Sequence, residues 1–139
     1  AAKRMKAHSG GNIIFVNSNT AYRAIPDRIA YVTSKGGQLG LMRALALDLG
    51  KYGIRVNAVL PGMTATEAVE KHLSDDFRSL FLKHIPLGRM GFPQEIANAV
   101  CYFASDESAY TTGQILTVSG GFGLGTPVYG DILSGKALR

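Results

Sequence analysis

The sequence predicts an α/β fold in which helices and strands alternate around a parallel sheet. Three short apolar runs, at residues 12–17, 54–60 and 114–118, have the length and the β-branched content of strands. Longer segments with helical periodicity separate them, at 29–50 and from 93 to about 105. Strands and helices that alternate in this way form parallel sheets with right-handed crossovers.

Length and composition indicate one globular domain. The 139 residues include 46% hydrophobic and 18% charged side chains, an ordinary globular composition. The formal charge is +5, but the basic residues are dispersed, whereas nucleic-acid-binding proteins concentrate theirs on one face. Since there is no apolar run of about 18 residues and no N-terminal leader pattern, we expect a cytoplasmic protein that binds neither nucleic acid nor membrane.

Neither the histidines nor the cysteine predicts a reactive centre. His8, His72 and His84 have no spacing that would build a metal site, so we expect no metal. Cys101 lies in the apolar run Ala-Val-Cys-Tyr-Phe-Ala, which favours a buried thiol over a nucleophile.

The chain begins with a helix and a strand. Residues 1–8 have the pattern of a helix that ends at Ser9-Gly10-Gly11. The strand at 12–17 is apolar without alternation, which is typical of a strand buried on both faces. Ser18 and two further small polar residues follow at its carboxyl end, where open α/β sheets bind ligands.

The first turn of the helix at 29–50 contains a phenol and an ammonium. Tyr31 and Lys35 are four residues apart and therefore share one helix face, with their Cβ atoms about 5–6 Å apart. A cation beside a phenol favours the phenolate, and such a phenol can act as a general acid or base on a carbonyl or alcohol oxygen. The same spacing also occurs in helices where the two residues have no joint role.

The same helix has apolar side chains on more than one side. Leu41 and Leu47 lie off its apolar stripe, so the helix is either sandwiched within the protein or shared with another subunit. Gly36 and Gly37 permit another backbone to approach closely, although a helix also tolerates glycine without such a neighbour. The stripe itself consists of Leu39, Met42, Leu45, Ala46 and Leu49.

The second strand ends at a possible binding rim. Gly53 closes the preceding helix, and Pro61-Gly62 ends the buried strand. Proline stops the pairing of the strand, and glycine lets a ligand come close to the backbone.

Residues 63–86 are either a lid over the site or a surface segment packed on the core. Ser74 is a good helix N-cap, followed by two aspartates in the first turn. The apolar face of that helix consists of Phe77, Leu80 and Phe81.

The last helix begins at Gly91-Phe92-Pro93, with proline at its first position, and carries Ile96, Val100 and Phe103 on one face.

Beyond the third strand, the glycines of residues 120–125 lack the spacing of a phosphate-binding loop. We therefore expect residues 120–139 to form an extended C-terminal tail.

From residue 10 to residue 121 the chain resembles the C-terminal half of the short-chain dehydrogenase/reductase family. The matching motifs occur in the family's order and at its intervals. They are Ser18 thirteen residues before Tyr31, Tyr31-x-x-x-Lys35, Arg55-Val56-Asn57-Ala58 with Pro61-Gly62, Pro86-Leu87-Gly88-Arg89, Pro93-Gln94-Glu95-Ile96-Ala97, and Thr112-Gly113-Gln114 with Gly120-Gly121. The resemblance implies a Rossmann-like, doubly wound parallel sheet, of which residues 1–139 would form one partial domain without the N-terminal βαβ nucleotide-binding unit.

The resemblance implies an NAD(P)-dependent oxidoreductase that interconverts an alcohol and a ketone or aldehyde. Tyr31 would exchange the proton with the substrate oxygen, and Ser18 would donate a hydrogen bond to that oxygen. Lys35 would favour the phenolate and hold the nicotinamide ribose of NAD or NADP. The other residues implied to bind the cofactor are Pro61, Gly62, Thr64 and Thr66.

Further expectations come with the resemblance. The family's glycine-rich loop and its catalytic asparagine belong to an N-terminal half, without which we expect the 139 residues to bind the cofactor poorly or not at all. The alternative function is a truncated, non-catalytic relative that acts as an oligomerisation or binding module through the helix at 29–50. The resemblance also implies a homodimer or homotetramer that acts on a small-molecule substrate. One residue departs from the family pattern: Ser119 stands where the family often has aspartate.

Overall fold

The computed structural model describes residues 1–8 and 10–125, and its centre is one parallel sheet. The strands are β1 (Gly11–Val16), β2 (Ile54–Pro61) and β3 (Ile115–Val118), in the order β1-β2-β3. β1 pairs with β2, and β2 pairs with β3, in both cases in parallel. The predicted parallel α/β architecture is confirmed; the part of the predicted tail at 126–139 lies outside the described residues.

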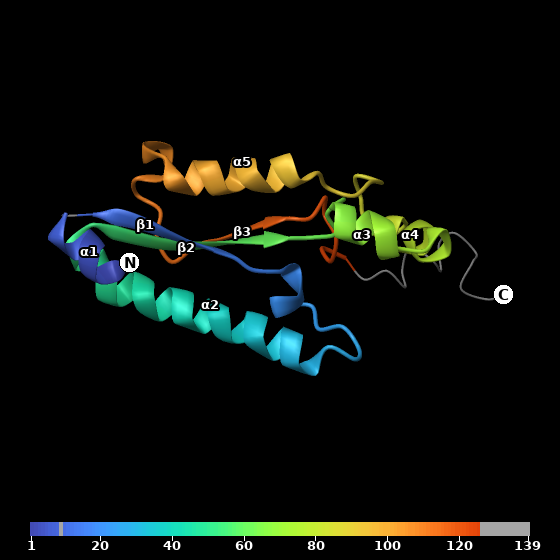
Figure 1. Cartoon of the computed structure of the whole chain (residues 1–139), viewed down its shortest axis with the longest axis horizontal. Coiled ribbons are helices and arrows are strands. Elements are labelled where there is room, and N and C mark those ends of the chain that lie inside the picture. Colours follow the sequence, from blue (N-terminus) through green and yellow to red (C-terminus); the bar gives the residue numbers. More distant parts are fainter. Residues whose placement is uncertain (9, 126–139) are drawn as a thin grey trace.

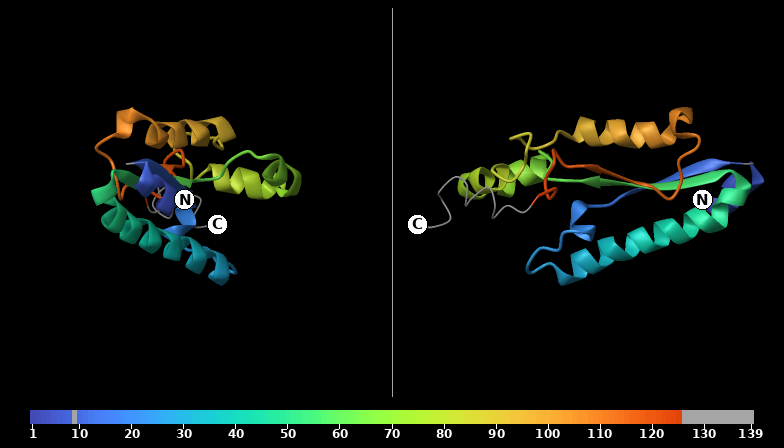
Figure 2. Two further views of the ribbon diagram at one scale, coloured as in Figure 1. Left: turned by 60° about the vertical axis from the view of Figure 1, so that its left-hand side comes forward. Right: turned by 180° about the vertical axis from the view of Figure 1, so that it is seen from behind.

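Helices cover both faces of the sheet (Figure 1). α1 (Ala2–Ala7) and α2 (Ile29–Leu49) lie on one face, and α5 (Pro93–Ala104) lies on the other. Figure 2 shows the sheet between these two helical layers. α3 (Glu67–His72) and α4 (Asp75–Leu82) lie beyond the carboxyl ends of the strands. Short 3-10 helices complete the chain: η1 (Asn19–Ala21), η2 (Gly50–Tyr52) and η3 (Asp106–Ser108).

The alternation of side chains along β2 divides the core in two. One set faces α2 and packs with its predicted apolar stripe, of which Leu45 is partly buried and the other four residues are buried. Val59 points to the opposite face and packs with Ile96, Ala99 and Phe103 of α5. The β2 residues on the α2 side are Ile54, Val56, Ala58 and Leu60.

The prediction that the first strand is buried on both faces is wrong. β1 is half-buried, and Val16 at its end is 54% exposed. Within the described residues β1 pairs with β2 alone, so it is an edge strand of the sheet, whereas the central strand β2 is buried over almost its whole length.

The prediction for Cys101 is also wrong, because its side chain is exposed. The buried face of α5 consists of Ile96, Ala99 and Phe103. Since successive residues turn by about 100° around a helix, position 101 falls well away from that stripe. An apolar run in the sequence therefore did not imply burial of each member.

The glycines of α2 have open space around them. A Cβ atom built on Gly36, Gly37 or Gly40 meets no heavy atom within 4 Å. No backbone of the described chain makes the close approach that these glycines would permit.

The segment at 63–86 forms two helices, of which only the second was predicted. Thr66 caps α3 through its side chain, which accepts a hydrogen bond from Val69 N, and Ser74 caps α4 as predicted. Neither helix has a buried residue, and Leu80 is 58% exposed. The apolar face of α4 is therefore only partly covered by the described residues, mainly where Phe81 stacks on Phe122 with 4.6 Å between ring centroids.

Residues 120–125 form turns rather than an extended tail, which corrects the prediction for this part of the chain. Gly120 accepts a hydrogen bond from Leu87 N, and a Cβ on Gly120 would lie 2.8 Å from Cγ2 of Ile85. A Cβ on Gly121 would lie 2.7 Å from Cγ of Pro86. The paired glycines thus allow close packing against the loop at 85–88.

Glu95 joins the loop before α5 to the first turn of that helix. Its two carboxylate oxygens accept hydrogen bonds from the guanidinium of Arg89 at 2.8 and 2.6 Å, and Phe92 N donates to it at 2.7 Å. The hydrogen bonds from Arg89, followed by that from Phe92, lower the pKa of Glu95 to about 2.

We expect Glu95→Gln to remove part of the acid sensitivity of the fold. The folded-state pKa lies below the ordinary value of 4.5, so the carboxylate stabilises the fold above pH 4.5 and loses that effect as the pH falls towards 2. The variant should be less stable than the wild type at pH 6, and the difference should shrink between pH 4.5 and 3. Urea midpoints across this range measure it, with Glu107→Gln as the control. Parallel pH profiles for wild type and Glu95→Gln would contradict the prediction.

Candidate active site

Asn17 brings the end of β1 and the first turns of α2 together. Its buried side chain donates to Lys35 O at 2.9 Å and to Oε1 of Gln38 at 3.2 Å, and its Oδ1 accepts from Ser18 N at 2.6 Å. One amide group thus holds both Ser18 and the backbone of Lys35. This role of Asn17, the last residue of the predicted strand at 12–17, was not predicted; the available signal was an amide side chain at the end of an otherwise apolar run.

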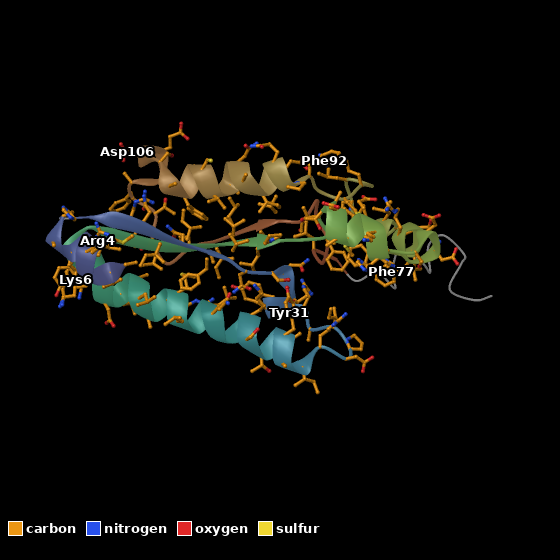
Figure 3. The ribbon with its side chains drawn as sticks, viewed as in Figure 1. Arg4, Lys6, Tyr31, Phe77, Phe92 and Asp106 are labelled. Atoms are coloured by element: carbon orange, nitrogen blue, oxygen red, sulfur yellow. The ribbon has the colours of Figure 1, made fainter. Side chains whose placement is uncertain are left out.

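Tyr31 and Lys35 lie on one face of α2, as predicted from their spacing. Nζ of Lys35 is 5.7 Å from the centroid of the Tyr31 ring and donates a long hydrogen bond, 3.4 Å, to Val16 O. Tyr31 is 45% exposed, and Figure 3 labels it on the part of α2 that lies beside η1. Because an ammonium has three donors, the bond to Val16 leaves two of them for a ligand.

Ser18 lies in the turn that caps η1. Its Oγ accepts hydrogen bonds from Thr20 N at 3.2 Å and from Oγ1 of Thr20 at 2.9 Å. These two bonds occupy its lone pairs, so the hydroxyl hydrogen of Ser18 is available for donation. A hydroxyl in this state can donate to a substrate oxygen.

The end of β2 lies at the same edge of the sheet as Ser18. Asn17 N donates to Val59 O, and Gly62 N donates to Val118 O, both at 2.9 Å. The carboxyl ends of the three parallel strands therefore meet at one edge. The close approach at Gly62 is made by the chain itself, because a Cβ there would lie 2.8 Å from the Cα and Cβ of Ser119.

The threonines after Pro61-Gly62 order the chain as it leaves β2. Oγ1 of Thr64 donates to Gly62 O at 3.2 Å, and Oγ1 of Thr66 accepts from Val69 N at 3.3 Å. Thr64 also forms an isolated parallel bridge with Gly91. Pro61, Gly62 and both threonines thus belong to the ordered segment that connects the end of β2 to α3.

Two further findings concern the described residues alone. No helix among them is long and apolar enough to cross a membrane. Residues 1–8 and 10–125 contain no group of three or more histidine, cysteine, aspartate or glutamate side chains that would hold a metal ion.

Comparisons with known proteins relate the whole described chain to oxidoreductases. Residues 1–123 match a protein family described as enoyl-(acyl carrier protein) reductase. A 7alpha-hydroxysteroid dehydrogenase of Paraclostridium sordellii is 46% identical over 136 residues, which are 97% of this chain and 51% of the relative.

Two solved structures have the same fold over most of the chain. A 7 alpha-hydroxysteroid dehydrogenase complexed with NADH and 7-oxo glycochenodeoxycholic acid matches with a TM-score of 0.84 and 37% identity, covering 87% of this chain and 48% of that one. A gluconate 5-dehydrogenase from Burkholderia cenocepacia J2315, in complex with NADP and tartrate, matches with a TM-score of 0.85 and 31% identity, covering 90% and 49%. The chain spans about half the length of the curated relatives it matches.

Proposed function

Because this chain belongs to the short-chain dehydrogenase/reductase family, we propose that the protein is an NAD(P)-dependent oxidoreductase that interconverts an alcohol and a ketone or aldehyde. The observation that supports this most directly is the docking of α2 on the end of β1. The side chain of Asn17 donates a hydrogen bond to Lys35 O and accepts one from Ser18 N. It therefore holds the helix turn of Lys35 close to Ser18. This arrangement supports a joint role for Ser18 and Lys35 at the carboxyl edge of the sheet, with Tyr31 one helix turn before Lys35.

Each of the three residues has a distinct part in the proposed reaction. Tyr31 gives its phenolic proton to the carbonyl oxygen during reduction and takes it back during oxidation. Ser18 donates its free hydroxyl hydrogen to the same oxygen, where negative charge develops. Lys35 favours the phenolate of Tyr31 by its nearby positive charge.

The nicotinamide cofactor, NAD or NADP, would supply or accept the hydride. Lys35 suits the ribose hydroxyls, because two of its three N–H donors are not used by the bond to Val16. Pro61, Gly62, Thr64 and Thr66 form the adjacent path from the sheet and present carbonyl and hydroxyl groups there. Ionic, hydroxyl and backbone groups of this kind suit the polar part of a dinucleotide. Residues 63–86 would cover the bound cofactor and substrate as a lid.

The test is hydride transfer by the protein at its full natural length. NADH and NADPH are each supplied with a panel of ketones that contains 7-oxo steroids, 3-oxoacyl thioesters and oxo sugar acids, and oxidation of the cofactor is followed at 340 nm by its loss of absorbance. We expect turnover with at least one ketone. Absence of both turnover and cofactor binding would contradict the proposal and favour the non-catalytic binding module.

We propose that the active protein is a homodimer or homotetramer joined through α2. Leu47 is 84% exposed and Leu41 is 51% exposed, and the space above Gly36, Gly37 and Gly40 is open. A second copy of this helix would cover these apolar side chains and approach the glycines closely. Sedimentation velocity should give a mass of at least two chains, and Leu47→Glu should lower it; a monomeric wild type would contradict the proposal.

A further inference from the structure

A cavity lies between the turn after β1 and residues 117–124. Its volume is about 750 Å³, within the range of small-molecule sites. The turn after β1 forms one wall, and the segment that includes the end of β3 forms the other. Asn19 belongs to the first wall and directly follows Ser18, so the cavity lies beside the turn that carries Ser18.

Most of the large side chains around the cavity are apolar. Tyr22 comes from the turn after β1, and Val118, Phe122 and Leu124 come from the opposite wall. The Phe122 ring stacks on Phe81 of α4, which extends the apolar surface beyond the cavity. Walls of this kind suit the body of an apolar molecule rather than a sugar.

Arg23 is the charged residue of the lining. Its stem lies against Gly123, because a Cβ on that glycine would be 3.2 Å from Nε and 3.4 Å from Cγ of Arg23. None of the described lining residues is acidic, and within residues 1–8 and 10–125 Arg23 forms no ion pair. Arg23 is exposed at the cavity, and a guanidinium beside apolar walls is suited to bind a carboxylate, with two parallel hydrogen bonds.

We propose that the substrate is an apolar ketone or alcohol that carries a carboxylate, and that Arg23 binds this carboxylate. The inference rests on the proposed function, because it places the reacting carbon beside Ser18. Arg23 lies five positions after Ser18 and just beyond η1, where Arg23 N donates to Asn19 O at 3.1 Å. A cavity of about 750 Å³ has room for a drug-sized ligand such as a steroid.

The test compares a 7-oxo steroid carboxylic acid with its methyl ester, which has the same ring system without the charge. Isothermal titration calorimetry measures the binding of both to the full-length protein with cofactor present. We expect the wild type to bind the acid about tenfold more tightly than the ester, the size of one charge-assisted interaction. Arg23→Gln should bind acid and ester equally and should keep the wild-type affinity for the ester.

Arg28→Gln is the matched control, because it removes the same charge from the same loop without touching the cavity lining. It should keep the preference for the acid. Equal binding of acid and ester by the wild type, retention of the preference by Arg23→Gln, or failure of the acid to bind would each overturn the inference. The proposed function is judged separately, by turnover with the ketone panel, and does not depend on the charge of the substrate.

Discussion

Tyr31→Phe is expected to lower kcat for carbonyl reduction by about 10²- to 10⁴-fold, the usual contribution of one general acid or base. The change removes the phenolic hydroxyl and keeps the ring, so the position of Lys35 over the ring, 5.7 Å from its centroid, need not change. Cofactor affinity and the free energy of unfolding should stay close to those of the wild type. Steady-state turnover, with cofactor binding measured by fluorescence, separates these effects.

Tyr102→Phe provides the control for this experiment. Tyr102 is a partly exposed tyrosine on α5, which lies across the sheet from α2. Its variant should retain wild-type kcat. If Tyr31→Phe also retained wild-type kcat, Tyr31 would have no place in the mechanism, and the proton would have to come from another group.

The elements of the fold could be predicted because local patterns determine them. The apolar stripe of α2 has helical spacing, and Pro93 begins α5 at the first helical position, as the sequence indicates. β2 was predicted as buried and is the central strand of the sheet. Each of these features depends on residues close together in the sequence.

The errors concern properties that depend on distant parts of the chain. The burial of β1 depends on its place at the edge of the sheet, which its own six residues do not encode. Cys101 has apolar neighbours in sequence, but its exposure depends on which side of α5 faces β2.

The candidate site shows the same division between local and distant information. The Tyr31 and Lys35 pair follows from helix geometry, and its position on one face of α2 is confirmed. Asn17 was missed because its role consists of hydrogen bonds to a helix that begins twelve residues later. The roles of these residues in catalysis stay predictions until turnover is measured.

Asn57 ties the central strand to the segment that leads into β3. It is 1% exposed, its Nδ2 donates to Thr111 O at 2.8 Å, and its Oδ1 accepts from Gln114 N at 3.0 Å. The neighbouring Arg55 ties β2 to the end of α5. Its guanidinium donates to Phe103 O and Ser105 O, each at 2.9 Å. The Arg55-Val56-Asn57-Ala58 motif therefore connects β2 to the end of α5 and to the segment that leads into β3.

Asn57→Leu is expected to lower the free energy of unfolding by about 1–3 kcal/mol, because it removes two part-buried hydrogen bonds at about 0.5–1.5 kcal/mol each. The size of the side chain barely changes, so lost hydrogen bonds rather than a cavity account for the loss. Urea titration followed by circular dichroism measures it. Asn98→Leu makes the same replacement on the exposed side of α5 and should change stability by less than about 0.5 kcal/mol. Equal stability of the Asn57→Leu protein and the wild type would mean that the turn at 111–114 is held by β-sheet pairing alone.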